Sequence, residues 1–279
     1  MQAPSLLSVQ TIQSLLTTQS LGWRIELHSH IDSTNREAMA LAETGGEHGT
    51  VVLADSQTEG KGRLSRRWFS PPGVNVYCSI VIKNALAMQR PSDWLSWLPL
   101  MTALASAEAI EVIAGTHTAV KWPNDLLIGD SKVGGILCES GTDVQSRPFQ
   151  VIGIGVNVNG TPADFPENLR GPATTIRHES GRFIDRNKLV AQLLHELEVC
   201  IEEYVSGGFE RVSHAYRQRC STIGKTVQAI LTDGKEFVGL AETIGKDGSL
   251  RVVQRRVPPD QRPPRVRELR AADIIHLRS

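Results

Sequence analysis

The sequence predicts an α+β fold: a mixed β-sheet with flanking helices, followed by a small C-terminal β-barrel. Between residues 23 and 221, short segments rich in Val and Ile alternate with longer segments of helical periodicity. After Gly224, short strands are separated by Asp-Gly turns, a pattern typical of antiparallel hairpins. The 279 residues suffice for one large and one small domain. We therefore expect a helical extension at 1–22, a main domain at 23–221 and a barrel domain at 222–279.

The first third of the chain predicts one short helix, three strands and a second helix. Apolar positions recur at helical spacing over 8–21, and Gly22 is suited to end that helix. The following segments are rich in β-branched residues and are interrupted by STNREAMALAE, a helix that Ser33 or Thr34 can cap. The strands are expected at 23–31, 50–55 and 74–82, and the helix at 33–43.

The middle of the chain predicts two long helices around a group of short strands. Residues 93–115 carry Ala, Leu and Glu at helical spacing and end at Gly115, so we expect a buried helix there. A second long helix is expected at 187–205 and a shorter one at 209–220. Four prolines within 257–265 predict an exposed loop rather than a central strand. The short strands are expected near 117–122, 125–129, 133–140 and 149–159.

Composition limits the class of partner and the compartment. Lys+Arg and Asp+Glu both number 30, so zero net charge gives no reason to expect duplex DNA or an acidic membrane as the main partner. The four cysteines are far apart and form neither a disulfide framework nor a zinc motif. The N-terminus lacks the features of a signal peptide, and no window has the apolar length of a membrane span. We expect a cytoplasmic protein.

The densest basic segment is TEGKGRLSRRWFSPPG, which runs from Thr58 to Gly73. Gly60 and Gly62 permit a ligand to approach the backbone closely, and Lys61 and Arg63 offer donors for phosphate or carboxylate oxygens. The segment has neither the third glycine and helix of a dinucleotide-binding loop nor the pattern of a P-loop. It is either a loop that closes on an anion or a solvated loop whose charges serve solubility.

A second candidate segment is KWPNDLLIG at 121–129, followed by SKVGGILCES. Asn124 and Asp125 favour a turn between two strands, and taken alone they have a structural explanation. Lys132, however, stands at the start of a strand, just ahead of the glycines Gly134 and Gly135. A lysine in that position can neutralise a phosphoryl group held against the backbone.

The segment IGIGVNVNG at 152–160 predicts a strand with one flat face, because Gly153 and Gly155 alternate with apolar residues. The flat face serves either close packing of neighbouring backbones or the floor of a site for a flat ligand. His28 and His30 form an H-x-H pair, but no further cluster of His and Asp completes a metal site. We therefore expect no metal-ligating residues in this protein.

Five segments, in order along the chain, resemble the motifs of the biotin protein ligases, also called biotin acetyl-CoA-carboxylase ligases. The similarity extends from about Trp23 to the C-terminal barrel, and it implies a class II synthetase-like main domain and an SH3-like barrel. Since 22 residues precede Trp23, we expect the monofunctional type without the N-terminal DNA-binding domain of some members. The segments are DSTN (32–35), Q-x-x-GKGR-x-x-R-x-WFSPPG (57–73), KWPNDLL (121–127), KVGGILCE (132–139) and GIGVNVN (153–159).

The resemblance implies a two-step reaction. Biotin attacks the α-phosphate of ATP to give biotinyl-5′-AMP and pyrophosphate, and a lysine of the biotin carboxyl carrier protein then attacks that anhydride. Both steps develop negative charge, so the family requires cations at the phosphate and Mg²⁺ with the nucleotide. By resemblance, Lys132 and Arg63 are the catalytic cations, and the loop from Gly60 to Arg66 closes over the adenylate.

The resemblance also assigns binding residues and partners. It implies the biotin carboxyl carrier protein as partner, no membrane and no DNA, and a monomer or homodimer. The biotin-binding residues it implies are Ser33, Thr34, Gln57, Gly60, Lys61, Arg63, Trp68, Lys132 and Gly135. The nucleotide-binding residues it implies are Arg66, Trp68, Asn124, Asp125 and Asn157.

The basic loop departs from the family pattern. Where many members read G-R-G-R-R-G, this chain has Lys61, Leu64 and Ser65 in place of two arginines and the last glycine. We expect looser closure and faster leakage of the adenylate. Two alternative functions remain open: transfer of lipoate or octanoate to a carrier lysine, and a non-catalytic biotin or nucleotide sensor. Retention of both Arg63 and Lys132 favours an enzyme over a sensor.

Overall fold

The main sheet of the computed structural model is mixed, as predicted. The structure describes residues 6–83, 93–231, 234–254, 265–270 and 272–277. The seven strands are ordered β1-β2-β3-β7-β6-β5-β4; β1 runs parallel to β2 and the remaining pairs are antiparallel. The bounds are β1 Ile25–His28, β2 Val51–Ala54, β3 Val76–Lys83, β4 Ala119–Lys121, β5 Asp125–Ile128, β6 Ser131–Thr142 and β7 Pro148–Val156.

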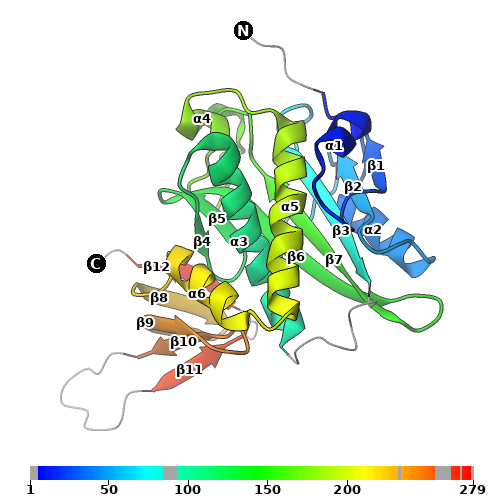
Figure 1. Ribbon diagram of the computed structural model, residues 1–279. Coiled ribbons are helices and arrows are strands. Elements are labelled where there is room, and N and C mark those ends of the chain that lie inside the picture. The colour runs from blue at the N-terminus through cyan, green and yellow to red at the C-terminus, as the bar shows by residue number, and fades with distance from the viewer. Residues whose placement is uncertain (1–5, 84–92, 232–233, 255–264, 271, 278–279) are drawn as a thin grey trace, which may run out of the picture.

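Helices cover both faces of this sheet (Figure 1). Alternate residues of β2 point to opposite sides, so Val51 packs in the large core with α3 and α5 while Val52 packs with α2. Helix α3 is the one described helix long and apolar enough to span a membrane, yet 72% of that window is buried. The helices are α1 Val9–Leu15, α2 Thr34–Glu43, α3 Trp94–Ala114, α4 Ile176–Ser180, α5 Arg186–Val205 and α6 Phe209–Arg219, with the 3-10 turn η2 at Pro162–Asp164.

The C-terminal strands form a second, antiparallel sheet in the order β11-β10-β9-β8-β12. Two indole N–H groups of the main fold donate to its β9–β10 turn: Trp97 to the carbonyl of Lys246 at 2.7 Å and Trp122 to that of Gly248 at 3.0 Å. The described pairings leave β11 and β12 at the edges, so closure into a barrel stays a prediction. The bounds are β8 Thr226–Leu231, β9 Glu236–Ile244, β10 Leu250–Val253, β11 Val266–Leu269 and β12 Ala272–His276.

The first helix is shorter than predicted: it was expected over 8–21, and α1 ends at Leu15. A carboxylate accounts for the difference: Glu198 of α5 accepts hydrogen bonds from the backbone N–H groups of Gln19, Ser20 and Leu21. Those groups are therefore satisfied without a helix. The Pro-rich segment predicted to be an exposed loop lies outside the described residues, apart from Arg265 at its end.

Candidate active site

A tryptophan ring lies against two opposed glycines on the face of the main sheet that α2 covers. Gly135 of β6 and Gly155 of β7 are directly opposite each other in the register. A Cβ added at Gly155 would lie 2.6 Å from the ring of Trp68, and one added at Gly135 would lie 3.3 Å from it. The flat surface predicted for this strand is therefore present, and the ring of Trp68 rests on it.

Lys132, at the start of β6, reaches over the same surface. Its Nζ lies 5.4 Å from the ring centroid of Trp68, within range of a cation–π contact. It also donates a hydrogen bond to Oδ1 of Asp125 at 2.5 Å, and the lysine side chain is 35% exposed. Two backbone bonds to the 172–174 segment hold the strand at this point. Lys132 is thus a fixed cation whose counter-ion is Asp125.

The basic loop forms a short hairpin above this surface. The N–H of Trp68 donates to the carbonyl of Gly60 at 2.7 Å, and that of Gly62 to the carbonyl of Arg66 at 2.7 Å. At the tip, Leu64 and Ser65 have φ angles of 55° and 59°. Both residues therefore occupy the left-handed region, which glycine and asparagine adopt at far lower cost. The tip is strained because this chain lacks the final glycine of the pattern.

Arg63 ties the hairpin to the turn between β4 and β5. Its guanidinium donates to Oδ1 of Asn124 at 3.0 Å, and the amide of Asn124 donates to the carbonyl of Ile136 at 2.8 Å. Burial lowers the pKa of Arg63, while the nearby carboxylate of Asp125 opposes that shift. An arginine remains charged under such a shift. Arg63 and Lys132 are consequently two cations near one carboxylate.

Uncharged polar groups are gathered beside the glycine pair. The amide oxygen of Gln57 accepts from the backbone N–H of Thr34 at 2.9 Å and from its hydroxyl at 3.1 Å. The amide nitrogen of Gln57 donates to the hydroxyl of Ser70 at 2.9 Å. Ser33, the N-cap residue of α2, is 1% exposed, and its side chain makes no cap hydrogen bond. These residues form a buried patch of hydroxyl and amide groups.

A deeper polar contact fixes α2 against the sheet. The amide of Asn35 donates to Glu139 at 2.8 Å, and its oxygen accepts from Ser79 at 2.6 Å. A Cβ at Gly153 would lie 2.0 Å from that oxygen. Gly153 is therefore a packing glycine, and Gly155 contacts the ring of Trp68. That the flat face is the floor of a ligand site stays a prediction.

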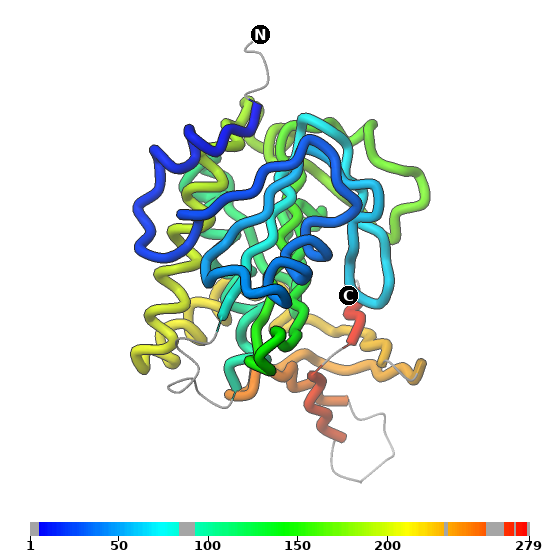
Figure 2. The backbone as a smooth tube through the Cα atoms, turned by 90° about the vertical axis from the view of Figure 1, so that its right-hand side faces the viewer, coloured from blue at the N-terminus to red at the C-terminus, as the bar shows by residue number. Residues whose placement is uncertain are grey.

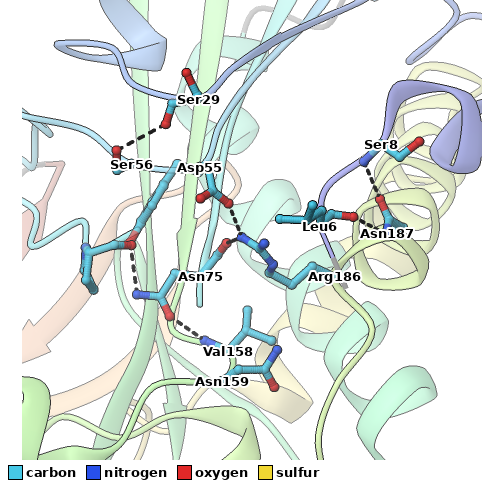
Figure 3. A network of polar contacts seen from close by, with 12 residues as sticks. Leu6, Ser8, Ser29, Asp55, Ser56, Asn75, Val158, Asn159, Arg186 and Asn187 are labelled. Carbon is cyan, nitrogen blue, oxygen red and sulfur yellow. Dashed lines mark hydrogen bonds and ion pairs between the residues drawn. The ribbon is translucent and has the colours of Figure 1, made fainter. Parts of the chain in front are cut away.

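A buried arginine joins the end of β2 to the start of β3 (Figure 3). Arg186 of α5 is fully buried and donates to Asp55 at 2.8 Å and to the carbonyl of Asn75 at 3.1 Å. The side-chain oxygen of Asn75 accepts from the N–H of Val158 at 2.9 Å. Because Asp55 lies two residues before Gln57, this network holds the segment from which the basic loop begins.

Some candidate residues lie away from the glycine surface. Lys61 is on the exposed outer part of the hairpin. Asn157 is 4% exposed, and its amide donates to the carbonyl of Thr174 at 3.2 Å. Arg66 forms an ion pair with Asp273 of β12, whereas Arg63 bonds to Asn124. Sequence reasoning missed Asp273, since nothing in the local sequence of β12 marks it.

No metal centre accompanies these residues. Among the described residues, no group of three or more His, Cys, Asp or Glu side chains could hold an ion. A cavity of about 270 Å³ lies elsewhere, between the start of α3, Trp122, Pro123 and the turn at Asp247. The cations Lys132 and Arg63 instead lie near the glycine pair, whose flat surface is covered by the ring of Trp68.

Most of the chain is similar to known proteins. Residues 27–159 match the biotin/lipoate A/B protein ligase family. The chain is 34% identical over 247 residues to the bifunctional ligase/repressor BirA of Bacillus subtilis, covering 88% of this chain and 74% of that protein. It is 30% identical to the biotin--[acetyl-CoA-carboxylase] ligase of Mycobacterium tuberculosis, covering 88% of this chain and 89% of that one.

A solved structure shows the same architecture. The biotin protein ligase of Aquifex aeolicus in complex with biotin and ATP superposes with a TM-score of 0.75 at 25% sequence identity, covering 92% of this chain and all of that one (100%). The extent and identity of these matches place the protein within one family. This chain belongs to the biotin/lipoate A/B protein ligase family.

Proposed function

We propose that the protein is a biotin protein ligase, which activates biotin with ATP to biotinyl-5′-AMP and transfers biotin to a lysine of a biotin carboxyl carrier protein. The observation that carries this proposal is the placing of Arg63 and Lys132 beside one glycine-flattened surface. A binding protein gains little from two cations there, whereas a reaction that adds charge to a phosphate needs them.

In the first step, an oxygen of the biotin carboxylate bonds to the α-phosphorus of ATP, and the bond to the pyrophosphate oxygen breaks. Lys132 supplies a compact charge, and Arg63 supplies planar paired donors. Asp125 is the partner of Lys132 in the structure. A phosphoryl oxygen can replace that carboxylate, so the lysine is oriented in advance without being left unpaired.

The buried polar patch suits the ureido ring of biotin. Ser33, Thr34 and Gln57 offer hydroxyl and amide groups. Trp68 provides apolar surface, and its indole N–H is buried without a hydrogen-bond partner in the described part of the chain. The lack of a side chain lets the ring of Trp68 approach Gly135 closely, and lets the backbone of Trp68 approach Gly60 closely. Asn124, Asn157 and Arg66 are proposed to position the nucleotide.

In the second step, the carrier lysine amine bonds to the biotinyl carbonyl carbon, and AMP leaves with the electron pair of the carbon–oxygen bond. Closure of the hairpin over the adenylate excludes water, which would otherwise hydrolyse the anhydride. The described residues form no carboxylate cage for a metal. This fits Mg²⁺ that arrives with ATP, because Mg²⁺ is commonly held by substrate phosphates and water.

The compartment and partners are proposed on narrower grounds. The four cysteines are free thiols, which fits a reducing cytoplasm. We propose the carrier protein as the macromolecular partner, no membrane or DNA partner, and a monomer or homodimer.

Pyrophosphate release separates the candidate functions. The purified chain is mixed with MgATP and with biotin, lipoate or octanoate in turn. We expect release with biotin alone. Release with lipoate or octanoate instead would retain the family and overturn the substrate, while binding of biotin without release would favour the sensor.

A further inference from the structure

The C-terminal sheet contacts the basic hairpin through one carboxylate. Asp273 on β12 forms an ion pair with Arg66, and Arg170, from the segment between β7 and α4, lies 3.7 Å from the same carboxylate. The Arg66 side chain is 36% exposed and that of Asp273 is 20% exposed. Figure 2 shows the hairpin extending from the main fold toward the end of the chain at β12.

The ion pair between Arg66 and Asp273 lies next to the strained tip of the hairpin. Leu64 and Ser65 occupy the left-handed region, so the tip is held in a backbone conformation that their side chains disfavour. Arg63 anchors one side of the hairpin to Asn124 of the main sheet. Arg66 anchors the other side to the C-terminal sheet. The strained tip therefore lies between two side-chain anchors.

We propose that Asp273 is a positioning residue for nucleotide binding: it holds Arg66, and with it the basic hairpin, over the site before ATP arrives. The inference rests on the proposed function for its kinetic consequence, although the positioning itself concerns the unliganded chain. It gives the C-terminal sheet a defined part in the activation step.

Electrostatics supports the need for a carboxylate here. Burial lowers the pKa of Arg66, the positive charges of Arg170 and Arg63 lower it further, and the carboxylate of Asp125 opposes the shift. Three guanidinium groups near one another repel when no phosphate lies between them. The contacts of Asp273 with Arg66 and Arg170 place a second carboxylate on the outer side of the hairpin, in addition to Asp125 beside Lys132. The cations can then gather before the anionic substrate binds.

A competing role for Asp273 predicts the opposite change in ATP binding. If Asp273 instead competed with phosphate for Arg66, removal of its charge would improve ATP binding. If it positions Arg66, removal of its charge weakens ATP binding and loosens the hairpin. The sign of the change in KM for ATP therefore decides between the two.

Hydrogen exchange tests the positioning without any catalysis. In the unliganded chain, the backbone N–H groups of Gly62, Arg66 and Trp68 are bonded within the hairpin. In Asp273→Asn we expect their exchange to be about fivefold faster, the size of effect typical of a partly exposed ion pair. Glu268→Gln, which removes an exposed carboxylate of β11, is the control and leaves exchange unchanged. Equal exchange in both variants would overturn the proposal.

Kinetics tests the consequence. For biotin adenylate formation, Asp273→Asn should raise KM for MgATP about fivefold with kcat nearly unchanged, and Asp273→Glu should restore most of the loss. In an Arg66→Ala background, Asp273→Asn should add nothing, because the carboxylate acts through that arginine. A lower KM, or an additive effect in that background, would overturn the proposal. A wild-type chain that forms no adenylate would contradict the proposed function, and the exchange experiment would still decide the role of Asp273.

Discussion

At the scale of single residues, the site is organised around cations held by carboxylates. Lys132 is paired with Asp125, and Arg66 is paired with Asp273. In the proposed reaction, each pair orients a positive group for the substrate phosphate. The catalytic advantage of such groups comes from being in place before charge develops.

Lys132→Ala tests the charge at the reacting phosphate. We expect biotin binding to remain nearly intact and adenylation to slow by about 10² to 10³, or roughly 2.7 to 4 kcal/mol of transition-state stabilisation. Single-turnover pyrophosphate release measures the step. Lys188→Ala, an exposed lysine of α5, is the control. An unchanged adenylation rate would remove Lys132 from the mechanism.

Ser65→Gly tests the strained hairpin tip. Glycine adopts the φ of 59° without the Cβ clash, so the closed hairpin should gain about 1 kcal/mol and leak adenylate about fivefold more slowly. Trapping of released adenylate with hydroxylamine measures the leak. Ser146→Gly relieves a similar φ of 60° in the β6–β7 hairpin and should not alter leakage. Equal leakage from Ser65→Gly and the wild type would refute the role of strain.

At the scale of elements, two adjacent strands create the flat surface. Gly135 and Gly155 stand opposite each other in β6 and β7, so the absence of two side chains opens one patch of the sheet. The ring of Trp68 covers that patch from the hairpin. Helix α2 lies at the adjacent end of this patch, where the backbone N–H of Thr34 donates to the side-chain amide oxygen of Gln57.

Gly155→Ala should change ligand binding at this surface while leaving the fold intact. The new Cβ would lie 2.6 Å from the indole of Trp68, so the ring must move, and we expect biotin affinity to fall about tenfold or more. Titration calorimetry measures the affinity, and scanning calorimetry checks folding. Gly171→Ala, which has no heavy atom within 4 Å of the added Cβ, should bind as the wild type does. Wild-type affinity in Gly155→Ala would show that the ring does not line the biotin site.

Periodicity predicted the elements well and their tertiary partners poorly. The apolar periodicity of α3 and the C-terminal Gly115 placed that helix within one residue of its observed ends. Helix α1 was predicted too long, because Glu198, far along the chain, binds the backbone that follows it. The motifs identified the loop and Lys132, but the pairing with Asp273 depends on how the second sheet docks, which no local pattern reports.

At the scale of the whole molecule, the two sheets meet beside the cationic site. His276 of β12 accepts or donates at Thr222 at 3.2 Å and lies 3.5 Å from the Nζ of Lys225. Burial, together with the positive charges of Lys121 and Lys225 and against the opposing charge of Asp130, lowers the pKa of His276 to about 4. The contact between the sheets therefore favours a neutral imidazole.

This shift predicts acid sensitivity of the folded chain. An unfolded histidine titrates near 6.5, so between pH 6.5 and about 4 the unfolded chain binds the additional proton. The contribution of His276 to stability is complete above pH 6.5 and is lost as the pH falls toward 4. Urea unfolding across this window should show a steeper loss in the wild type than in His276→Gln. Parallel profiles would contradict the shift.

The most direct test of the central claim is transfer of radiolabelled biotin from biotin and MgATP, by the purified chain, to an apo carrier domain. Lipoate and octanoate are tested beside it, and a carrier whose acceptor lysine is replaced serves as control. We predict labelling with biotin alone that depends on ATP and on the acceptor lysine. Labelling with lipoate or octanoate instead, or no labelling of the carrier, would contradict the account.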